Sequence, residues 1–382
     1  MHRRCTRVEA ERPDRQYLIR VMPAKEGVLR VHVAVVGGGV IGLSCALALS
    51  ESGRRVTVFD DATGDPMPPA SSVAGGMLAA VGEARTGEDA LWSLLRRGAD
   101  AWDRQLRRLG SEVVTADDTV LVGTDTADIE HLGTVADWVA ERSGTLEVVG
   151  AAAARRLVPG AGPRIRGGVV VKGERAVDNS LVIDALRRCL EEAAVPIVRR
   201  RVDDLGAVDA DRVVLAAGCG SEALWPGLGI HPVKGEVLRL SRGRYALPPP
   251  TCVVRALVNG RPVYLVPRAD GVVVGATSYD GDAGDPQPQV GGVVDLLTDA
   301  MTVLPGLREY RLAGIQAGFR PGTADGLPLI GALDDRVVAA TGHGRNGFAL
   351  AALTGELIRE LFDGAEAAPE LDPRRRYQGG TA

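Results

Sequence analysis

The chain has 382 residues, 45% of them hydrophobic and 25% charged, with a formal net charge of −4. This length favours roughly two domains, and the composition is that of a folded globular protein, which excludes a disordered chain. No basic run stands beside aromatic residues, so we expect no nucleic-acid partner. The 49 glycines argue against a helical bundle and indicate tight turns or close approaches of the backbone to a ligand.

The apolar runs and the cysteines indicate where in the cell the protein is located. The apolar run 31–49 is broken by glycines, so it indicates a strand, a turn and a helix, and we expect no membrane span. Residues 1–27 lack the apolar segment of a signal peptide, and we expect them to be a disordered extension. The cysteines are scattered, which predicts no disulfide framework, no metal site and a cytoplasmic location. They are Cys5, Cys45, Cys189, Cys219 and Cys252.

The N-terminal third begins with a strand, a glycine turn, a helix and a second strand. Residues 31–36 are a β-branched run typical of a buried parallel strand, residues 40–51 predict a helix, and residues 56–59 predict a strand. Between the first strand and the helix stands Gly37-x-Gly39-x-x-Gly42, which allows a tight turn and brings a pyrophosphate to the helix N-terminus. Asp60 ends the second strand, where a carboxylate can bind a ribose hydroxyl. The unit therefore predicts a dinucleotide site, with NAD and FAD both open at this point.

The rest of the chain continues the α/β pattern, with a β-rich section between nucleotide-type signals at its two ends. We predict helices over 88–109, 181–192, 293–303 and from 347 to about 361. We predict strands over 212–218, 231–240, 263–267, 272–277 and 337–340. Residues 281–292 are expected to form a surface loop.

Three further stretches carry candidate chemistry. Residues 70–77 are a run of small residues that could lay hydroxyls and amides against a phosphate, or could be an ordinary loop. Residues 313–331 contain Arg320, and residues 342–347 form a second glycine-rich loop directly before the final predicted helix. The N-terminal dipole of that helix would favour negative charge on a ligand bound there.

Seven stretches together resemble the glycine oxidase branch of the D-amino-acid-oxidase (DAO) family of FAD enzymes, over about residues 31–361. They are residues 35–42, 71–77, 232–236, 264–268, 275–277, 317–322 and 342–347. The resemblance implies an α/β fold in which a Rossmann-like FAD-binding domain carries an inserted, mainly antiparallel β-sheet substrate domain. The implied ranges are 28–83, 148–229 and 313–364 for FAD, 84–147 and 230–312 for substrate, and 365–382 for a tail.

The resemblance also implies the site residues, with no catalytic acid or base assigned. FAD is expected to bind non-covalently, because a covalent flavin in this family needs a late cysteine and the last one here is Cys252. The implied substrate-binding residues are Arg320, Tyr264, Arg345 and Met77. The implied cofactor-binding residues are Gly37, Gly39, Val40, Ile41, Gly42, Asp60, Asp61, Ser71, Ser72, Gly75, Gly76, Met77, Val202, His343, Gly344, Arg345, Asn346, Gly347, Phe348 and Ala349.

These residue types suit the chemistry, although each has a plainer interpretation. An arginine fork binds both oxygens of a carboxylate and fixes the α-carbon, yet Arg320 could instead pair with an acid of the protein. Tyr264 could be a core aromatic, and Met77 could simply pack. His343 is better explained as a hydrogen-bond donor that shapes its loop than as a catalyst.

The implied activity is oxidation of a glycine-type amino acid by FAD and O2, giving hydrogen peroxide and an imine that hydrolyses to glyoxylate and an amine. Thiamine thiazole biosynthesis is the expected context, and a homo-oligomer is the habit of the family. The alternative substrate is an N-carboxymethyl amino acid of secondary metabolism, favoured by Pro262 and Ser278 if they make the pocket roomier. A nicotinamide-dependent dehydrogenase or a non-catalytic binding protein is disfavoured by the 342–347 loop and by Arg320 with Tyr264.

Overall fold

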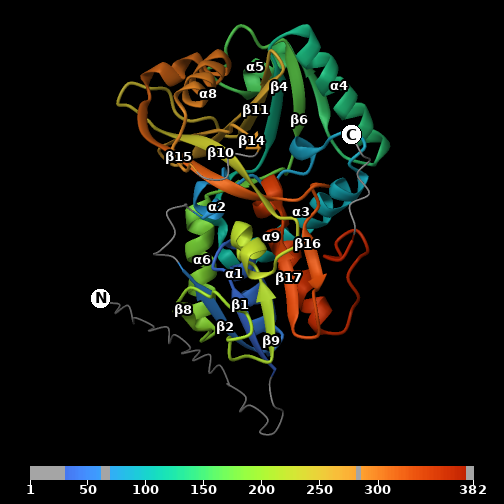
Figure 1. The fold of residues 1–382 in the computed structure, drawn as a ribbon. Helices are drawn as coiled ribbons and strands as arrows, with labels where there is room; N and C mark the ends of the chain where they lie inside the picture. Colours follow the sequence, from blue (N-terminus) through green and yellow to red (C-terminus); the bar gives the residue numbers. More distant parts are fainter. Residues whose placement is uncertain (1–30, 62–68, 281–284, 376–382) are drawn as a thin grey trace, which may run out of the picture. The chain divides into compact units, whose positions relative to one another are not determined.

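The computed structural model describes residues 31–61, 69–280 and 285–375. Their strands form a six-stranded sheet, a nine-stranded sheet and a two-stranded pair, and Figure 1 shows how helices cover the two larger sheets. The extension expected over residues 1–27 lies outside the described residues. Among the described helices, none combines the length and apolar character that a membrane span requires.

The six-stranded sheet is built around the predicted strand–helix–strand unit. All neighbouring strands are parallel except β16 and β17. In β1, Val33 and Val35 enter one core while Ala34 and Val36 enter another, so both faces are covered, as a parallel sheet requires. The spatial order is β16 (Leu329–Ala332), β17 (Val337–Thr341), β9 (Arg212–Leu215), β1 (His32–Val36), β2 (Arg55–Asp60) and β8 (Ile197–Arg199).

One face of this sheet shares its core with four helices. They are α1 (Val40–Glu51), α3 (Asp89–Leu109), α6 (Asn179–Glu192) and α9 (Gly347–Phe362). Helix α1 packs against both α6 and α9, and α3 packs against α9. Trp102 of α3 donates its indole N–H to the carbonyl of Phe348 at 2.6 Å, which fixes α3 to the first turn of α9. The bounds predicted for α1 are confirmed.

The nine-stranded sheet is antiparallel except where β11 runs parallel to β4. Its order is β14 (Tyr279–Asp280), β10 (His231–Ser241), β13 (Gly271–Gly275), β12 (Arg261–Arg268), β11 (Val253–Val258), β4 (Thr119–Gly123), β6 (Gly167–Val171) and β5 (Glu147–Gly150). Strand β15 (Arg311–Gly322) pairs along β10. One core of this sheet contains residues of α5 (Ala151–Leu157) and α8 (Val290–Val303), and another contains residues of α4 (Thr126–Glu141).

The sheets divide the chain differently from the expected ranges. Strands β5, β6 and β15 belong to the nine-stranded sheet, although the ranges beginning at 148 and 313 assign them wholly or largely to the cofactor domain. Helix α3 shares the core of the six-stranded sheet, although it falls in the range 84–147. Strand pairing joins segments that are distant in the chain, so ranges drawn along the sequence do not follow the sheets.

Three local expectations also change. Residues 70–73 form a short helix, α2 (Ala70–Val73), within the stretch expected to be a loop. Helix α8 begins at Val290, inside the expected loop 281–292. The described part of the tail packs on β16, because Leu371 is buried and its carbonyl accepts from Ile330 N–H at 2.8 Å; residues 376–382 lie outside the described ranges.

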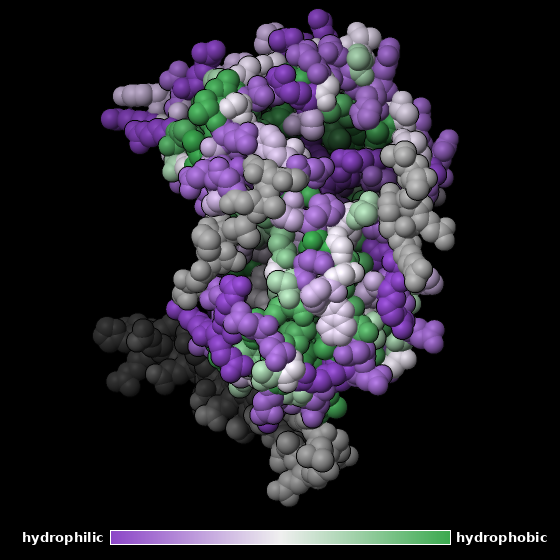
Figure 2. Space-filling view, in the orientation of Figure 1, coloured by the Kyte–Doolittle hydropathy of each residue, from purple (hydrophilic) through white to green (hydrophobic). Residues whose placement is uncertain are grey.

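Exposed apolar side chains gather on α8 and the neighbouring β15, and Figure 2 shows apolar surface near the α8 end of the visible face. Val290 and Val294 are 80% and 53% exposed, and with Ile315 they line a shallow groove. This groove shares no lining residue with the larger cavity between the two sheets.

The remaining described elements are short. They are β3 (Val114–Ala116), β7 (Ala176–Val177), α7 (Ser221–Leu224) and the 3-10 helices at Val81–Glu83, Ser111–Val113, Gly218–Gly220, Pro305–Glu309 and Gly344–Asn346.

Candidate active site

A cavity of about 430 Å³ is lined by residues of both large sheets and by the first turns of α1 and α9. At one end it is bounded by the turn after β1, the end of β2 and the turn after β9. At the other end it is bounded by β10, β12 and β15. A ligand in this cavity therefore contacts the six-stranded and the nine-stranded sheet together.

The glycine turn after β1 forms one wall, where Gly37, Gly39, Val40 and Ile41 line the cavity. Gly37 has φ +118°, and a Cβ atom on it would overlap the carbonyl of Ala216. A side chain at this position is therefore excluded by both conformation and space. Gly42 does not line the cavity. A Cβ atom there would overlap the carbonyl of Gly37, so this glycine allows the start of α1 to pack closely against the turn.

Asp60 lies at the end of β2, beside this turn. Its Oδ1 accepts from Gly38 N–H at 3.3 Å, and its Oδ2 lies 3.3 Å from Arg187 Nη2. Asp61 and Val202 line the same part of the cavity. The carboxylate thus stands where the glycine turn predicts a ribose, with one oxygen already on the turn.

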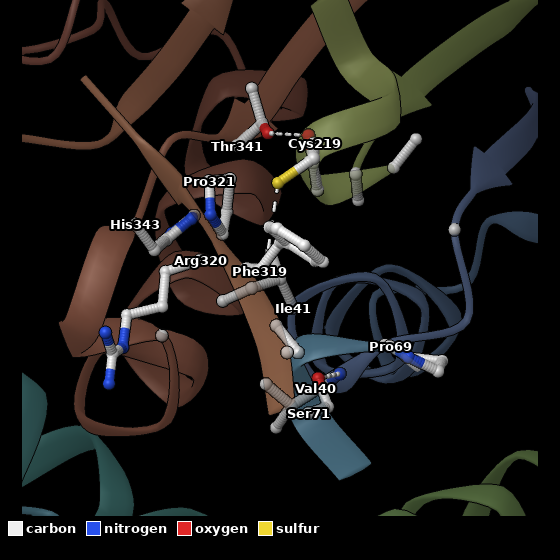
Figure 3. Close-up of a pocket in the computed structure, with 18 of the residues that line it drawn as sticks. Val40, Ile41, Pro69, Ser71, Cys219, Phe319, Arg320, Pro321, Thr341 and His343 are labelled. Carbon is white, nitrogen blue, oxygen red and sulfur yellow. Dashed lines mark hydrogen bonds between the residues drawn. The ribbon is translucent and has the colours of Figure 1, made fainter. Parts of the chain in front are cut away.

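Residues 70–77 cross from one sheet to the other. Ser71 lines the cavity, and its Oγ accepts from Val40 N–H at 3.0 Å at the start of α1, as Figure 3 shows. Asn179 Nδ2 donates to the carbonyls of both Ser71 and Ser72 at 2.9 Å, and Arg268 Nη2 donates to Gly75 O at 3.0 Å. These side chains hold the backbone of the motif so that Gly75, Gly76 and Met77 line the cavity.

Ser72 is placed differently from its neighbour. It is exposed, does not line the cavity and donates its hydroxyl to Pro69 O at 2.8 Å. The adjacent serines therefore have separate environments, because the start of α2 turns one side chain inward and the other outward.

The loop after β17 lines the cavity from His343 to Ala349 and leads into α9. His343 is buried, and its Nε2 lies 2.9 Å from Thr354 Oγ1. Because Thr354 donates its own hydroxyl to Leu350 O, the imidazole must donate from Nε2. Burial lowers the pKa of His343 to about 3, so the ring is neutral at physiological pH and shapes the loop.

Two polar atoms of this loop lack a partner within the described part of the chain. They are His343 Nδ1 and Asn346 Oδ1, both buried. Such groups cost free energy unless a ligand or water satisfies them. Together with the glycine turn, Asp60 and two helix N-termini on one cavity, they fit the extended dinucleotide FAD that the sequence resemblance implies.

The opposite end of the cavity contains Arg320 and Tyr264. Arg320 projects from β15, with Nη1 and Nη2 each 3.3 Å from the carbonyl of Thr277, and Figure 3 shows it beside Phe319 and Pro321. Among residues 31–61, 69–280 and 285–375, no acidic side chain forms an ion pair with it. The Tyr264 phenol lies against Gly75 and Gly275, and burial raises its pKa.

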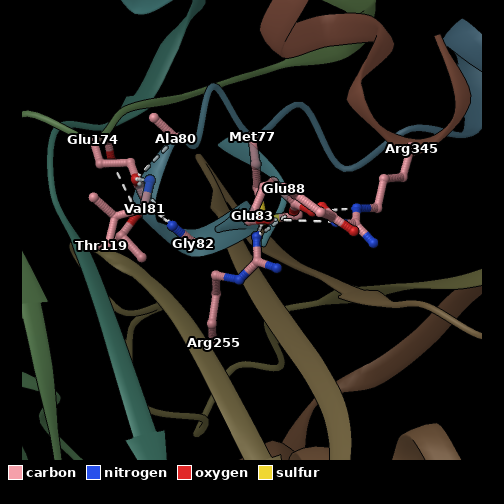
Figure 4. A network of polar contacts seen from close by, with 10 residues as sticks. All are labelled: Met77, Ala80, Val81, Gly82, Glu83, Glu88, Thr119, Glu174, Arg255 and Arg345. Carbon is pink, nitrogen blue, oxygen red and sulfur yellow. Dashed lines mark hydrogen bonds and ion pairs between the residues drawn. The ribbon is translucent and has the colours of Figure 1, made fainter. Parts of the chain in front are cut away.

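Arg345 is paired differently from Arg320, although it also lines the cavity. Its Nε lies 2.9 Å from Glu83 Oε2, and its Nη2 lies 3.5 Å from Glu88 Oε2. Glu83 Oε1 also accepts from Arg255 Nη1 at 2.6 Å, so Figure 4 shows Glu83 between two arginines. Burial alone would raise the pKa of Glu83, but the charges of Arg255 and Arg345 lower it.

Behind this pair lies the buried carboxylate of Glu174. It accepts the N–H groups of Ala80, Val81 and Gly82 at 2.7–3.2 Å (Figure 4). Burial raises its pKa, while the three N–H groups satisfy its oxygens. The turn that carries Glu83 is thereby fixed against the cavity wall.

The cavity brings together every expected site residue except Gly42 and Ser72. Pro262 and Ser278 are exposed and do not line it, so the prediction of a roomier pocket from these two residues is wrong. Glu83 lines it without having been expected, because its arginine partners are far away in sequence. The turn 216–220 also lines it, where the sequence predicts a strand that runs into a glycine turn.

Comparisons with known proteins show which family the chain belongs to. The family model described as DAO, FAD dependent oxidoreductase, matches residues 32–361. The chain is 30% identical over 361 residues to the glycine oxidase of Bacillus licheniformis, covering 88% of this chain and 94% of that protein. It is 32% identical over 338 residues to the putative thiamine biosynthesis oxidoreductase ThiO of Rhizobium etli, covering 87% and 97%.

A solved structure shows the same fold. The crystal structure of glycine oxidase from Geobacillus kaustophilus matches with a TM-score of 0.81 at 26% identity, covering 91% of this chain and 99% of that one. The match spans the parts of the chain that contribute to both large sheets. The chain therefore belongs to the DAO family of FAD-dependent oxidoreductases, as its sequence motifs predicted.

Proposed function

We propose that this FAD-dependent oxidoreductase oxidises glycine or a simple N-substituted glycine with O2, giving hydrogen peroxide and an imine that hydrolyses to glyoxylate and the amine. The observation that carries the proposal is the Arg320 guanidinium, which lines the cavity without an acidic partner in the described residues. A cation placed in this way is suited to a carboxylate from outside the protein.

Arg320 would bind the substrate carboxylate through two parallel N–H donors. The fork fixes both the position and the plane of the carboxylate, and so the position of the α-carbon. Only two of its five N–H donors go to the Thr277 carbonyl, at 3.3 Å each, which leaves the others for a charged acceptor.

Tyr264 would donate to the same carboxylate. Its hydroxyl makes no hydrogen bond to another described residue, and its raised pKa keeps it protonated at physiological pH. Its ring lies against Gly75 and Gly275, which fixes the position of the hydroxyl oxygen.

Hydride acceptance from the α-carbon and electron transfer to O2 are the chemistry that FAD supplies when bound. The protein then needs to orient the substrate, since the lone pair of the unprotonated amine forms the C=N bond as the hydride leaves the α-carbon. His343 is neutral and hydrogen-bonded to Thr354, so it is not proposed as the base. Protons leaving the amine would go to solvent.

For the cofactor, we propose that the first turn of α1 binds the pyrophosphate, that Asp60 binds the ribose, and that the first turn of α9 faces the flavin ring. Domain boundaries would then follow the two large sheets. We also propose non-covalent attachment. Acid precipitation should release the flavin into the supernatant, and colour that stays in the pellet would contradict this part.

We also propose a role in thiamine biosynthesis, because the similar protein of Rhizobium etli is named a putative thiamine biosynthesis oxidoreductase. Deletion of the gene should make growth depend on added thiamine. Growth of the deletion strain without thiamine would refute the role in thiamine biosynthesis, but not the proposed activity.

The substrate is tested by mixing the oxidised holoenzyme anaerobically with glycine, sarcosine, longer N-alkyl glycines and an N-carboxymethyl amino acid. Glycine or a simple N-substituted glycine should bleach the flavin, and aerobic mixing should then give glyoxylate and hydrogen peroxide. Bleaching by the N-carboxymethyl compound alone would favour that alternative, and bleaching by none would refute the substrate class.

A further inference from the structure

We infer that Glu236 is a positioning residue for substrate binding, acting on Arg320 through Thr277. This inference rests on the proposed function, because it assumes that Arg320 binds the substrate carboxylate. Glu236 is a buried acid on β10, and Thr277 stands between its side chain and the guanidinium.

Thr277 supplies the hydrogen bonds that support Arg320. Both Nη atoms of Arg320 donate to the Thr277 carbonyl at 3.3 Å. The guanidinium also lies against Gly235, where a Cβ atom would overlap Nη1, Nη2 and Cζ. The guanidinium therefore contacts the bare backbone of Gly235 and the carbonyl of Thr277. Its position depends on the position of Thr277.

Residue 236 holds Thr277 through three hydrogen bonds, two of them from its backbone and one from its carboxylate. Glu236 N–H donates to Thr277 Oγ1 at 2.9 Å, Thr277 Oγ1 donates to Glu236 Oε2 at 3.2 Å, and Thr277 N–H donates to Glu236 O at 3.3 Å. The threonine hydroxyl is thus both acceptor and donor toward one residue. Thr277 lies outside the strands, so these bonds replace the ladder that would otherwise hold its backbone.

The carboxylate of Glu236 also holds the segment between Thr277 and α8. It accepts from Tyr279 OH at 3.4 Å and from Gln289 N–H at 2.5 Å, directly before α8. A Cβ atom on Gly292 would overlap its Oε2, so α8 lies close against it. Glu236 itself is fully buried. One carboxylate thereby connects β10, Thr277 and the start of α8.

Glu236 does not contact the substrate end of the cavity itself. It does not line the cavity, whereas Gly235 and Arg320 do. Because successive side chains of a strand point to opposite faces, Glu236 lies on the face of β10 opposite to Gly235. Its effect on the substrate must pass through Thr277.

The test uses acetate as a minimal carboxylate, titrated into oxidised holoenzyme and followed by the flavin absorption spectrum. Glu236→Gln replaces one acceptor oxygen by a donor, and Thr277→Val removes the hydroxyl at nearly constant volume. We expect each to raise the dissociation constant of acetate by about tenfold, on the scale of one displaced charge-assisted hydrogen bond. Thr277→Ser, which keeps the hydroxyl, should recover most of the loss seen with valine.

Asp128→Asn is the matched control. Asp128 is also a buried acid that accepts a threonine hydroxyl, from Thr124 at 3.0 Å, and backbone N–H groups. It makes no contact with the cavity, so its variant should bind acetate like the wild type even where its stability falls.

Two outcomes would overturn the inference: equal acetate affinity in Thr277→Val and wild type, or equal losses in Asp128→Asn and Glu236→Gln. The valine and serine pair gives the decision even if Glu236→Gln does not fold. Acetate binding requires no turnover, so these results are distinct from a failure of glycine to bleach the wild-type flavin.

Discussion

The guanidinium of Arg320 on β15 lies against the backbone of Gly235 on β10, which is two residues beyond Val233, the residue paired with Arg320. A Cβ atom at Gly235 would overlap the guanidinium, so the glycine at this position of β10 makes room for the charged group. The pairing register of the two strands therefore places the proposed carboxylate-binding cation at the cavity.

Gly235→Ala should displace Arg320 and raise the Michaelis constant for the substrate by about 10- to 100-fold, because a shift of roughly 1 Å suffices for such losses. Flavin content should be unchanged. Steady-state kinetics measure this, with Gly314→Ala as control, since a Cβ atom at Gly314 on β15 meets no atom within 4 Å. Equal constants in the two variants would contradict the account.

Ser71→Ala should weaken FAD binding by roughly 3- to 10-fold, the value of one hydrogen bond. The Ser71 Oγ accepts from Val40 N–H, and its hydroxyl hydrogen has no acceptor in the described residues, which leaves it for a phosphate oxygen. Fluorescence titration of apoprotein with FAD measures the change. Ser72→Ala is the control, because that hydroxyl points to Pro69 O; a larger effect there would reverse the assignment.

His343→Gln should make the free energy of unfolding fall less steeply as the pH is lowered into mild acid. The pKa of His343 falls from 6.5 to about 3 through burial, so the unfolded chain binds a proton below pH 6.5 that the folded chain refuses. The stabilising contribution is complete above pH 6.5 and is lost as the pH falls toward about 3, at up to about 1.4 kcal/mol per pH unit.

Glutamine can still donate to Thr354 but does not titrate. Urea unfolding of the wild type and the variant between pH 7 and pH 5 gives the comparison. Parallel pH profiles would show that His343 is not held neutral.

Glu83→Gln should lower the free energy of unfolding by about 3 kcal/mol, because it leaves two partly buried arginines without their shared carboxylate. The lowered pKa of Glu83 means that this contribution is present above the ordinary value of 4.5 and is lost as the pH falls below it. The difference from the wild type should therefore shrink in acid.

Glu88→Gln is the control for this cluster. Glu88 lies 3.5 Å from Arg345 and is 38% exposed, so its removal should cost less than about 1 kcal/mol. Chemical unfolding of both variants measures the difference, and equal costs would contradict the assignment of Glu83 as the central acid.

The sequence predicted best where a motif is local. The turn at Gly37–Gly42, helix α1 and the strand that ends at Asp60 depend on residues close in the chain, and their bounds agree with the prediction to within one residue. The substrate end was harder, because Arg320 and Gly235 meet only through the pairing of β10 and β15.

Arg345 shows why the remainder escaped prediction. Its motif placed it at the cavity, but its partner Glu83 is 262 residues away, and no spacing in the sequence indicates their ion pair. In the same way, nothing local tells Ser71 from Ser72; only the start of α2 separates the inward hydroxyl from the outward one.

The most direct test of the central claim is anaerobic rapid mixing of glycine with the wild type and with Arg320→Lys. A lysine cannot present the two parallel donors of a guanidinium. Losing one charge-assisted bond of roughly 1.5–3 kcal/mol should raise the substrate concentration for half-maximal flavin reduction by about 10- to 100-fold. Flavin content should be unchanged. Arg311→Lys, at the exposed start of the same strand and outside the cavity lining, should behave like the wild type. An unchanged dependence on glycine concentration in Arg320→Lys would show that the carboxylate binds elsewhere.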